Sequence, residues 1–301
     1  MYDTPKKRFT YVSISLLLYQ LVTFLVTMMV VSTVSAQIDR LAHLHYLTDA
    51  VYISMLISML ITFLIVHFGF RRQIGLRLHL QSEDKPRFKE IAAGFLLGFG
   101  MNIALTLLFN LLSEAFSIPI TGDGYYLTSY PLTNVLMIVT VVIAAPLFEE
   151  YLFRGVILMT LQRYGNWFAI MVSSLLFALS HGTISQAACV FFLGFVIGYL
   201  TVRSGSLRLA ILFHMLNNAI ALLPMFISSE MLSNLLSLVL LAAGIAGVVL
   251  LILLIRRRKT FVASLTTPYD YPISRFFQNW ASILLIILFV AMLLINFVQI
   301  L

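Results

Sequence analysis

The stretch LTNVLMIVTVVIAAPLFEEYLF, residues 132–153, is apolar for almost its whole length but carries two adjacent carboxylates near its end. A helix of this length crosses about 30 Å of hydrocarbon, because it rises about 1.5 Å per residue. An ionisable side chain inside a bilayer costs roughly 2.5–3.5 kcal/mol, so Glu149 and Glu150 are expected to serve a function there. The stretch therefore predicts a transmembrane helix with a polar site.

The composition of the whole chain agrees with this helix. Apolar residues make up 61% of the chain and charged residues 10%, and the mean hydropathy is +1.00. A typical soluble domain carries about 25% charged residues, so lipid is the solvent for most of this chain. We predict an all-α, polytopic transmembrane helical bundle of eight to nine spans. The apolar stretches lie near residues 9–35, 47–70, 91–113, 132–153, 167–183, 187–202, 207–227, 231–255 and 279–301.

The net charge of +7 is distributed in a way that indicates membrane orientation. If Lys6, Lys7 and Arg8 hold the N-terminus in the cytoplasm, all 19 Lys and Arg residues except Arg40 and Arg154 fall on cytoplasmic loops or helix ends. This is the positive-inside bias, in which basic residues meet anionic headgroups. It argues against nucleic acid as a partner. It predicts a multi-pass cell-membrane protein, and the loop-poor architecture suits a bacterial plasma membrane.

Two further features predict helix packing and not chemistry. Gly94 with Gly98 and Gly194 with Gly198 are spaced four apart, which lets transmembrane helices approach closely. Cys189 is the single cysteine and lies within a span, so no disulfide can form within the chain. We interpret it as a small residue of the packed interior.

Helical spacing separates the charged residues of the fourth span into two groups. Glu150 and Arg154 are four residues apart, so they share a helix face and can form an ion pair. Glu149 points about 100° away, at the angular step of an α-helix, and has no cation at that spacing. Pro146 lacks a backbone N–H and tends to kink the helix just before the pair. Glu149 is therefore the carboxylate that we expect to react.

Two neighbouring spans repeat a pattern of paired residues four positions apart. Phe177 and His181 share one helix face, and so do His214 and Asn218. Together with the carboxylates, these intramembrane groups predict one functional cluster. The remaining histidines lie in loops or near span ends and are assigned no role: His43, His45, His67 and His79.

The expected depth of these residues can be compared through the helical rise. Glu149 lies about 21 Å from Arg163, and His181 lies about 22 Å from the start of its span. Those two residues therefore match in depth. His214 lies only about 9 Å past Arg208, and Asn218 about 15 Å. The count predicts a shallower position for His214 and Asn218, unless helix tilt or a different span boundary corrects it.

At these residues the sequence resembles the CAAX-protease and bacteriocin-processing (CPBP, or Abi) family of intramembrane glutamic endopeptidases. The first family motif is present as EEYLFRG, residues 149–155; the second matches Phe177 and His181; the third matches His214 and Asn218. The resemblance covers roughly residues 91–223. It implies three parts, with two helices and a basic cytoplasmic loop in 1–90, a protease core in 91–227, and two helices with a basic loop in 228–301.

The resemblance implies hydrolysis of peptide bonds in membrane-associated peptides or proteins. By hypothesis, Glu149 takes a proton from water that His181 positions, while His214 and Asn218 stabilise the oxyanion. Glu150 and Arg154 would hold the local charge. A metal version uses Glu149, His181 and His214 as zinc ligands. Because the histidines come from different spans and no His-Glu-x-x-His motif exists, we favour a site without a metal or other cofactor.

Two other functions would use the same polar cluster. A non-catalytic membrane scaffold or bacteriocin self-immunity protein could bind a membrane peptide with this fold, although it would not need groups that activate water. A transporter could use Glu149 and the histidines as a proton relay. The transporter would be expected to show inverted repeats, and none stands out in the sequence.

Overall fold

The computed structural model describes residues 4–37, 44–70, 86–117, 125–265 and 270–300. Within these ranges the ordered elements are all helices, which confirms the all-α prediction. The first part of the chain forms α1 (Pro5–Gln37), α2 (Leu44–Leu64) with the π-helical turn η1 (Ile65–Phe70), and α4 (Phe88–Phe116). The central helix is built from α5 (Pro131–Ile138), η2 (Val139–Ala144), α6 (Ala145–Glu150), η3 (Tyr151–Leu158), α7 (Met159–Leu161) and η4 (Gln162–Tyr164).

The rest of the described chain forms eight more helical elements. These are α8 (Asn166–Leu179), α9 (Ile184–Ser204), α10 (Leu207–Leu222) with η5 (Leu223–Phe226), α11 (Glu230–Arg256), α12 (Arg258–Leu265), η6 (Ile273–Gln278) and α13 (Trp280–Ile300).

Each of the nine expected apolar stretches coincides with a helix. Seven of them are long and apolar enough to cross a bilayer: Pro5–Ser35, Tyr46–Gly69, Phe88–Phe116, Pro131–Tyr164, Ile184–Ser204, Leu207–Phe226 and Glu230–Arg256. Two shorter apolar helices, Asn166–Leu179 and Trp280–Asn296, coincide with the fifth and ninth expected stretches. The chain is therefore a multi-pass membrane protein.

The central helix is longer than the sequence predicts. The apolar stretch was expected to end near residue 153, but the helical segment continues to Tyr164. Arg154 does not end the helix, because its charge is paired within the protein and its side chain is fully buried. The residues that follow it, from Val156 to Leu158, are also fully buried and pack in the interior.

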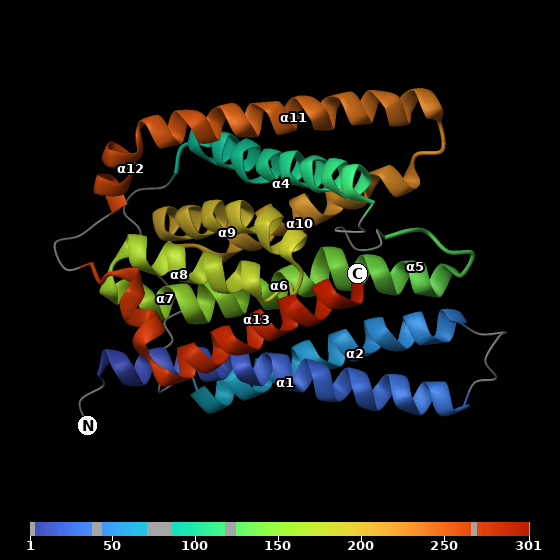
Figure 1. Ribbon diagram of the computed structural model, residues 1–301, viewed down its shortest axis with the longest axis horizontal. Helices are drawn as coiled ribbons and strands as arrows, with labels where there is room; N and C mark the ends of the chain where they lie inside the picture. The colour runs from blue at the N-terminus through green and yellow to red at the C-terminus, as the bar shows by residue number, and fades with distance from the viewer. Residues whose placement is uncertain (1–3, 38–43, 71–85, 118–124, 266–269, 301) are drawn as a thin grey trace.

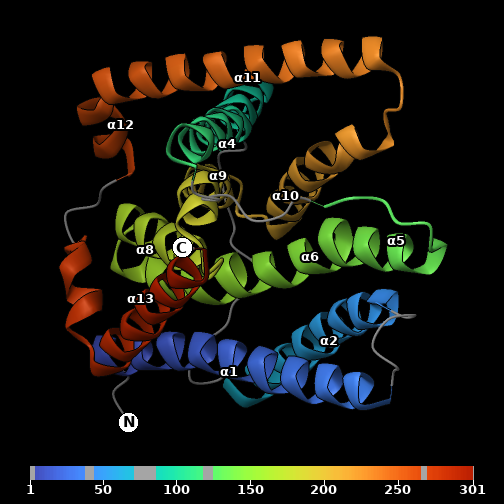
Figure 2. The same cartoon turned by 45° about the vertical axis from the view of Figure 1, so that its right-hand side comes forward.

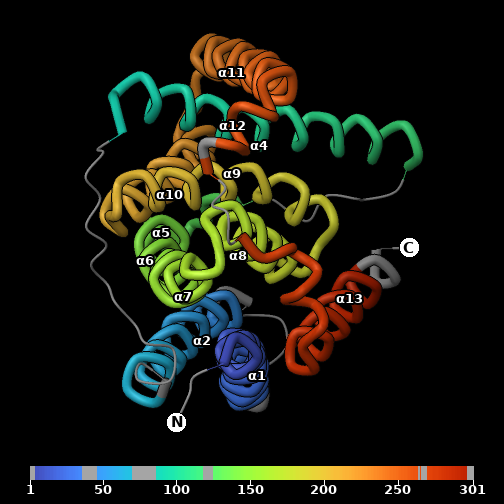
Figure 3. Tube along the Cα trace, turned by 90° about the vertical axis from the view of Figure 1, so that its left-hand side faces the viewer, coloured from blue at the N-terminus to red at the C-terminus, as the bar shows by residue number. Residues whose placement is uncertain are grey.

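The long helices run side by side in layers (Figure 1). α1 packs on α2 and on α13, whereas on the far side α11 packs on α4, which in turn packs on α9. Seen along the bundle, α1 and α11 lie at opposite sides, with the central helix and α8 to α10 between them (Figure 3). The central helix is thus surrounded by protein, which makes it the place where buried polar groups can find partners.

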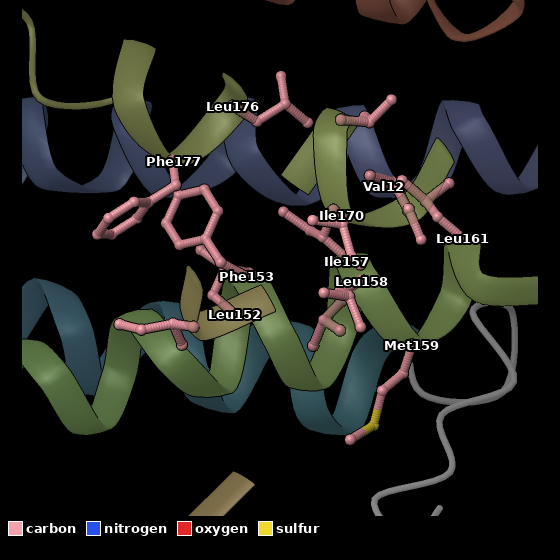
Figure 4. Packing of buried hydrophobic residues seen from close by; sticks show 14 of the residues in the cluster. Val12, Leu152, Phe153, Ile157, Leu158, Met159, Leu161, Ile170, Leu176 and Phe177 are labelled. Carbon is pink, nitrogen blue, oxygen red and sulfur yellow. The ribbon is translucent and has the colours of Figure 1, made fainter. Parts of the chain in front are cut away.

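The interior is centred on η3 and α8. Leu152, Phe153 and Ile157 are fully buried, and Figure 4 shows them facing residues of α8. The rings of Phe153 and Phe177 meet edge to face with their centroids 5.1 Å apart. Such tight packing fixes the helix faces that carry the polar cluster.

The predicted small-residue contacts are present. On α4, a Cβ at Gly94 would lie 3.1 Å from a methyl group of Val196, and on α9 a Cβ at Gly198 would lie 3.3 Å from Leu158. A closer crossing joins α4 to α11, where Gly100 lies against the backbone of Ala243 and Gly247. There the two backbones meet at a distance that leaves no room for a side chain.

Candidate active site

The buried charge of the site is concentrated on Glu150. Its Oε1 accepts hydrogen bonds from Arg154 Nη1 at 3.0 Å and from His214 Nδ1 at 2.8 Å. The expected ion pair on one helix face therefore forms, and both of its side chains are fully buried. Arg154 also donates to the carbonyl of Gly194 at 3.0 Å and stacks 4.5 Å from the ring centre of Phe177. These contacts offset part of the cost of burying the guanidinium, whose Nε has no hydrogen-bond partner among the described residues.

His214 connects the two carboxylates. Its Nδ1 must carry the hydrogen that Glu150 accepts, because a carboxylate only accepts. This bond fixes the ring so that Nε2 points toward Glu149, whose Oε2 lies 3.8 Å away. The distance is too long for a direct hydrogen bond, and a contact of this length can be bridged by water.

The position of His214 corrects the depth estimate. The helical rise predicted a shallower residue, yet His214 directly contacts both Glu149 and Glu150. The count failed because α10 is inclined to the central helix (Figure 2), so residue number along the two helices does not measure depth on a common axis.

Glu149 differs from its neighbour in exposure and in partners. Its side chain is 17% exposed, whereas that of Glu150 is fully buried. The turns around it are wide, because π-helical segments lie on both sides of α6, and α6 contains Pro146. Such π-helical turns are often found at functional sites.

His181 lies at the end of α8, where the chain turns toward α9. Its Nδ1 donates to the carbonyl of Phe177 at 2.8 Å, which leaves Nε2 of the neutral ring as an acceptor. The Phe177 ring meets His181 edge to face at 4.9 Å and His214 at 5.7 Å. Phe177 therefore separates the two imidazoles and supports both.

The turn that carries His181 is held by two amide side chains that the sequence analysis missed. Asn296 on α13 donates to the carbonyl of Gly182 at 2.7 Å, and Gln20 on α1 donates to that of Ser180 at 3.5 Å. Gly182 has a φ of 77°, a left-handed conformation that favours glycine. In the sequence, each of these two amides could have been identified as a polar residue within an apolar span.

Asn218 is fixed through the π-helical geometry of the central helix. The N–H of Ala145 bonds to the carbonyl of Thr140, so the next carbonyl, on Val141, would be paired with the N–H of residue 146. Residue 146 is proline and has no N–H. Asn218 Nδ2 donates to that carbonyl at 2.9 Å instead.

A second asparagine, missed by the sequence analysis, orients Asn218. Asn217 Nδ2 donates to Asn218 Oδ1 at 3.1 Å, and Asn217 is buried. This bond identifies which end of the Asn218 amide is the oxygen, so the Nδ2 group faces Val141. Asn217 was visible in the sequence as the neighbour of a motif residue.

Glu149, His181, His214 and Asn218 all line one cavity of about 530 Å³. The other polar residues of its wall are Asn102, Thr106, Tyr125, Ser185, Gln186, Cys189 and Asn217. Glu150 and Arg154 are not among the lining residues and lie behind His214. The four residues that the sequence analysis expected to react thus line this cavity, and the two that it expected to hold charge do not.

Tyr125 places a further hydroxyl group at the cavity. Although the residue is 53% exposed, desolvation and the charge of Glu149 both raise the pKa of its hydroxyl. The hydroxyl therefore stays protonated and can donate a hydrogen bond at neutral pH.

Of the histidines that were assigned no role, His67 does have a partner. Its Nδ1 lies 3.0 Å from the hydroxyl of Tyr151, the residue that follows Glu150. His43 and His79 lie outside the described residues. Among the described residues, no three His, Cys, Asp or Glu side chains are grouped closely enough to hold a metal ion. Glu149, His181 and His214 share the cavity without forming such a group.

Fold and site define a multi-pass helical membrane protein with a buried carboxylate–histidine centre at an internal cavity. Residues 131–220 match the model of the Type II CAAX prenyl endopeptidase Rce1-like family. The match confirms the resemblance stated from the sequence motifs, and all six candidate residues lie within it.

A curated protein is similar to part of this chain. An uncharacterized 24.3 kDa protein of Escherichia coli is 36% identical over 95 residues, which are 30% of this chain. The matched part spans 44% of the length of that relative. No solved structure matches the chain.

Proposed function

We propose that the protein is a membrane-embedded endopeptidase that uses Glu149 to activate water against membrane-associated peptides or proteins. The observation that carries the proposal is the pair formed by Glu149 Oε2 and His214 Nε2, 3.8 Å apart at the cavity wall. A water molecule at hydrogen-bond distance from both atoms fits this spacing. The family match supports the same class of reaction.

The reaction begins with general-base catalysis. Glu149 takes a proton from the water while the water oxygen attacks the carbonyl carbon of the scissile bond. This attack gives a tetrahedral oxyanion. The oxyanion re-forms the carbonyl, the C–N bond breaks, and the departing nitrogen takes the proton from Glu149. The products are a carboxylic acid and an amine, and Glu149 is again a carboxylate. His181 Nε2, an acceptor, orients the attacking water.

His214 stabilises the oxyanion in its imidazolium form. Since Nδ1 is bonded to Glu150, Nε2 donates only when the ring carries two protons. Glu150 stabilises that positive ring, as a buried carboxylate does for a catalytic histidine. The two carboxylates then balance Arg154 and His214, so the buried centre is electrically neutral.

Asn218 supplies a second donor to the oxyanion. One hydrogen of its Nδ2 is used by the carbonyl of Val141, which leaves the other available at the cavity. A donor held in place before the reaction stabilises developing charge without reorganisation, and the loss of one such donor costs roughly 10²–10³ in rate.

The test compares the peptides of membranes and culture medium from cells with wild-type protein and with Glu149→Gln. Cleavage products present only with the wild type would support the proposal and identify substrates. Glu230→Gln, the same change at an exposed residue of α11, serves as the matched control. If Glu149→Gln gives the same products as the wild type, the endopeptidase assignment is wrong and a scaffold or immunity role is favoured.

Zinc held by Glu149, His181 and His214 is the competing version of the site. A bound zinc ion would supply Lewis-acid activation of the water. Elemental analysis of the purified protein and an assay in chelator distinguish the two versions. We expect activity to persist in chelator. If the purified protein holds stoichiometric zinc and its removal abolishes cleavage, the zinc version is correct and the metal-free version is wrong.

A further inference from the structure

The basic residues of the described chain, apart from Arg154, gather at one end of the bundle, which we call the basic end. They lie at the start of α1, α4 and α10, at the end of the central helix, α9 and α11, and in η6. The residues are Lys6, Lys7, Arg8, Arg87, Lys89, Arg163, Arg203, Arg208, Arg256, Arg257, Arg258, Lys259 and Arg275. At this end, the start of α1 lies beside the turn that leads into α13 (Figures 1 and 2).

A cleft of about 660 Å³ lies between these two segments. The start of α1 contributes Lys6 and Phe9 to its wall, and the segment before α13 contributes Tyr271, Arg275 and Gln278. Pockets that bind small molecules have volumes of about 300–1,000 Å³. The cleft is therefore large enough for a ligand of the size of a lipid headgroup.

Packing and hydrogen bonds hold the two walls of the cleft together. The Nδ2 of the buried Asn279 donates to the carbonyl of Lys6 and to the hydroxyl of Thr10, both at 3.0 Å. The buried rings of Phe9 and Phe276 pack with their centroids 5.5 Å apart. The cleft is thus formed before a ligand binds, which lowers the entropic cost of binding.

The charge of the cleft is positive. The side chains of Lys6 and Arg275 are exposed there, and neither forms an ion pair with another described residue. Among the described residues that line the cleft there is no Asp or Glu. The carboxylate of Asp270 lies against Gly165 and is not part of the wall. The positive end of the α1 dipole adds to this charge, so the cleft favours an anion.

The cleft lies at the depth where lipid headgroups are found. The membrane-spanning part of α1 begins at Pro5, which lines the cleft. Trp280 follows the last residue of the wall and is 53% exposed, and Tyr271 is also exposed. Trp and Tyr are enriched at the boundary between membrane and water. Phosphate groups of lipids are therefore the anions present at the highest density beside this cleft.

We infer that the cleft is a binding site for the phosphate group of an anionic headgroup, such as that of phosphatidylglycerol. Lys6 and Arg275 pair with the phosphate oxygens, and the amide of Gln278 donates a further hydrogen bond. The rings of Phe9 and Tyr271 contact the carbon atoms next to the phosphate. None of these residues lines the central cavity, so binding here does not depend on the proposed peptidase activity.

Native mass spectrometry of the full-length protein in an uncharged detergent tests the site. Phosphatidylglycerol and phosphatidylcholine of equal chain length are titrated in. We expect one tightly retained phosphatidylglycerol, bound about tenfold more tightly than phosphatidylcholine, because the choline cation neutralises the phosphate and is repelled by the cleft. The absence of a retained phosphatidylglycerol on the wild type overturns the inference.

Two double variants that lose the same charge separate a built site from general attraction to the basic end. Lys6→Gln with Arg275→Gln should weaken the retained phosphatidylglycerol about tenfold or more, because charge-assisted hydrogen bonds are lost. Arg257→Gln with Arg258→Gln changes exposed residues outside the cleft and should leave that lipid in place. An equal loss in both pairs overturns the inference. All four residues are exposed, so thermal unfolding in lipid-free detergent should match the wild type.

Inorganic phosphate distinguishes the two sources of the same chemical group. Titrated against the retained phosphatidylglycerol, it should displace the lipid only at a concentration about tenfold higher or more, because it makes no contact with the apolar part of the cleft. Binding of inorganic phosphate as tight as that of the lipid, lost with Lys6→Gln and Arg275→Gln, would support the phosphate site and overturn its assignment to a lipid.

Discussion

Glu149 and Glu150 are chemically identical neighbours that lie in different surroundings. Glu150 is fully buried and accepts hydrogen bonds from both Arg154 and His214. Glu149 is partly exposed at the cavity and faces His214 at 3.8 Å. About 100° of helix rotation thus separates a fully buried carboxylate from one that faces the cavity, and their substitutions should have different effects.

Glu149→Gln should abolish cleavage and leave stability nearly unchanged. The amide has nearly the same shape but cannot take a proton from water, and general-base catalysis contributes about 10²–10⁴ in rate. Turnover of a cleaved peptide and thermal unfolding in detergent would be measured side by side. A variant that keeps more than about a tenth of the wild-type turnover would exclude Glu149 as the base.

Glu150→Gln should lower stability as well as activity. It leaves the Arg154 charge buried without a counter-ion, and breaking a buried pair costs about 3–5 kcal/mol. The midpoint of thermal unfolding should fall clearly below that of Glu149→Gln. Equal midpoints for the two variants would show that Glu150 does not hold the buried charge.

At the scale of elements, α1 and α13 reach the site although they lie outside the matched segment. Asn296 and Gln20 bond to the carbonyls of Gly182 and Ser180, on either side of His181. Through these contacts the flanking helices support a candidate site whose residues come from the central helix, the turn after α8 and α10.

Asn296→Leu should reduce turnover about tenfold with little change in KM, because it removes the donor that positions the His181 turn while the side chain keeps its size. Restoration by Asn296→Gln would support a role in positioning. Asn110→Leu, at an exposed site on α4, is the matched control. A parallel loss in the control, or an unchanged Asn296→Leu enzyme, would contradict the assignment.

The contact between α4 and α11 gives a prediction about packing. Gly100→Val should force the two helices apart, because its Cβ would collide with the backbone of α11, and overpacking costs about 1–3 kcal/mol. Thermal unfolding should shift to lower temperature. Gly69→Ala, where an added Cβ meets open space, should leave the midpoint in place.

Spans and local ion pairs could be predicted from the sequence because they depend on short-range rules. Apolar runs marked the seven helices long enough to cross a bilayer and the two shorter apolar ones, and four-residue spacing identified the bond between Glu150 and Arg154. Helix inclination could not be predicted, so His214 was placed too shallow. The support from Asn296 was also missed, because it depends on contacts between residues more than a hundred positions apart in sequence.

For the whole molecule, the segregation of charge predicts a dependence on lipid. The basic residues at one end of the bundle should bind anionic headgroups, each worth about 1 kcal/mol near a charged surface. The protein in nanodiscs with phosphatidylglycerol should therefore unfold at a higher temperature than in phosphatidylcholine. Since the Debye length falls to about 3 Å at 1 M salt, high salt should remove most of the difference.

A charge-neutralised variant shows which residues are responsible for this dependence. Replacing the four basic residues at 256–259 with Gln should reduce the lipid effect without altering the cavity, which they do not line. Equal unfolding temperatures of the wild type in both lipids at low salt would show that the basic end does not meet the headgroups.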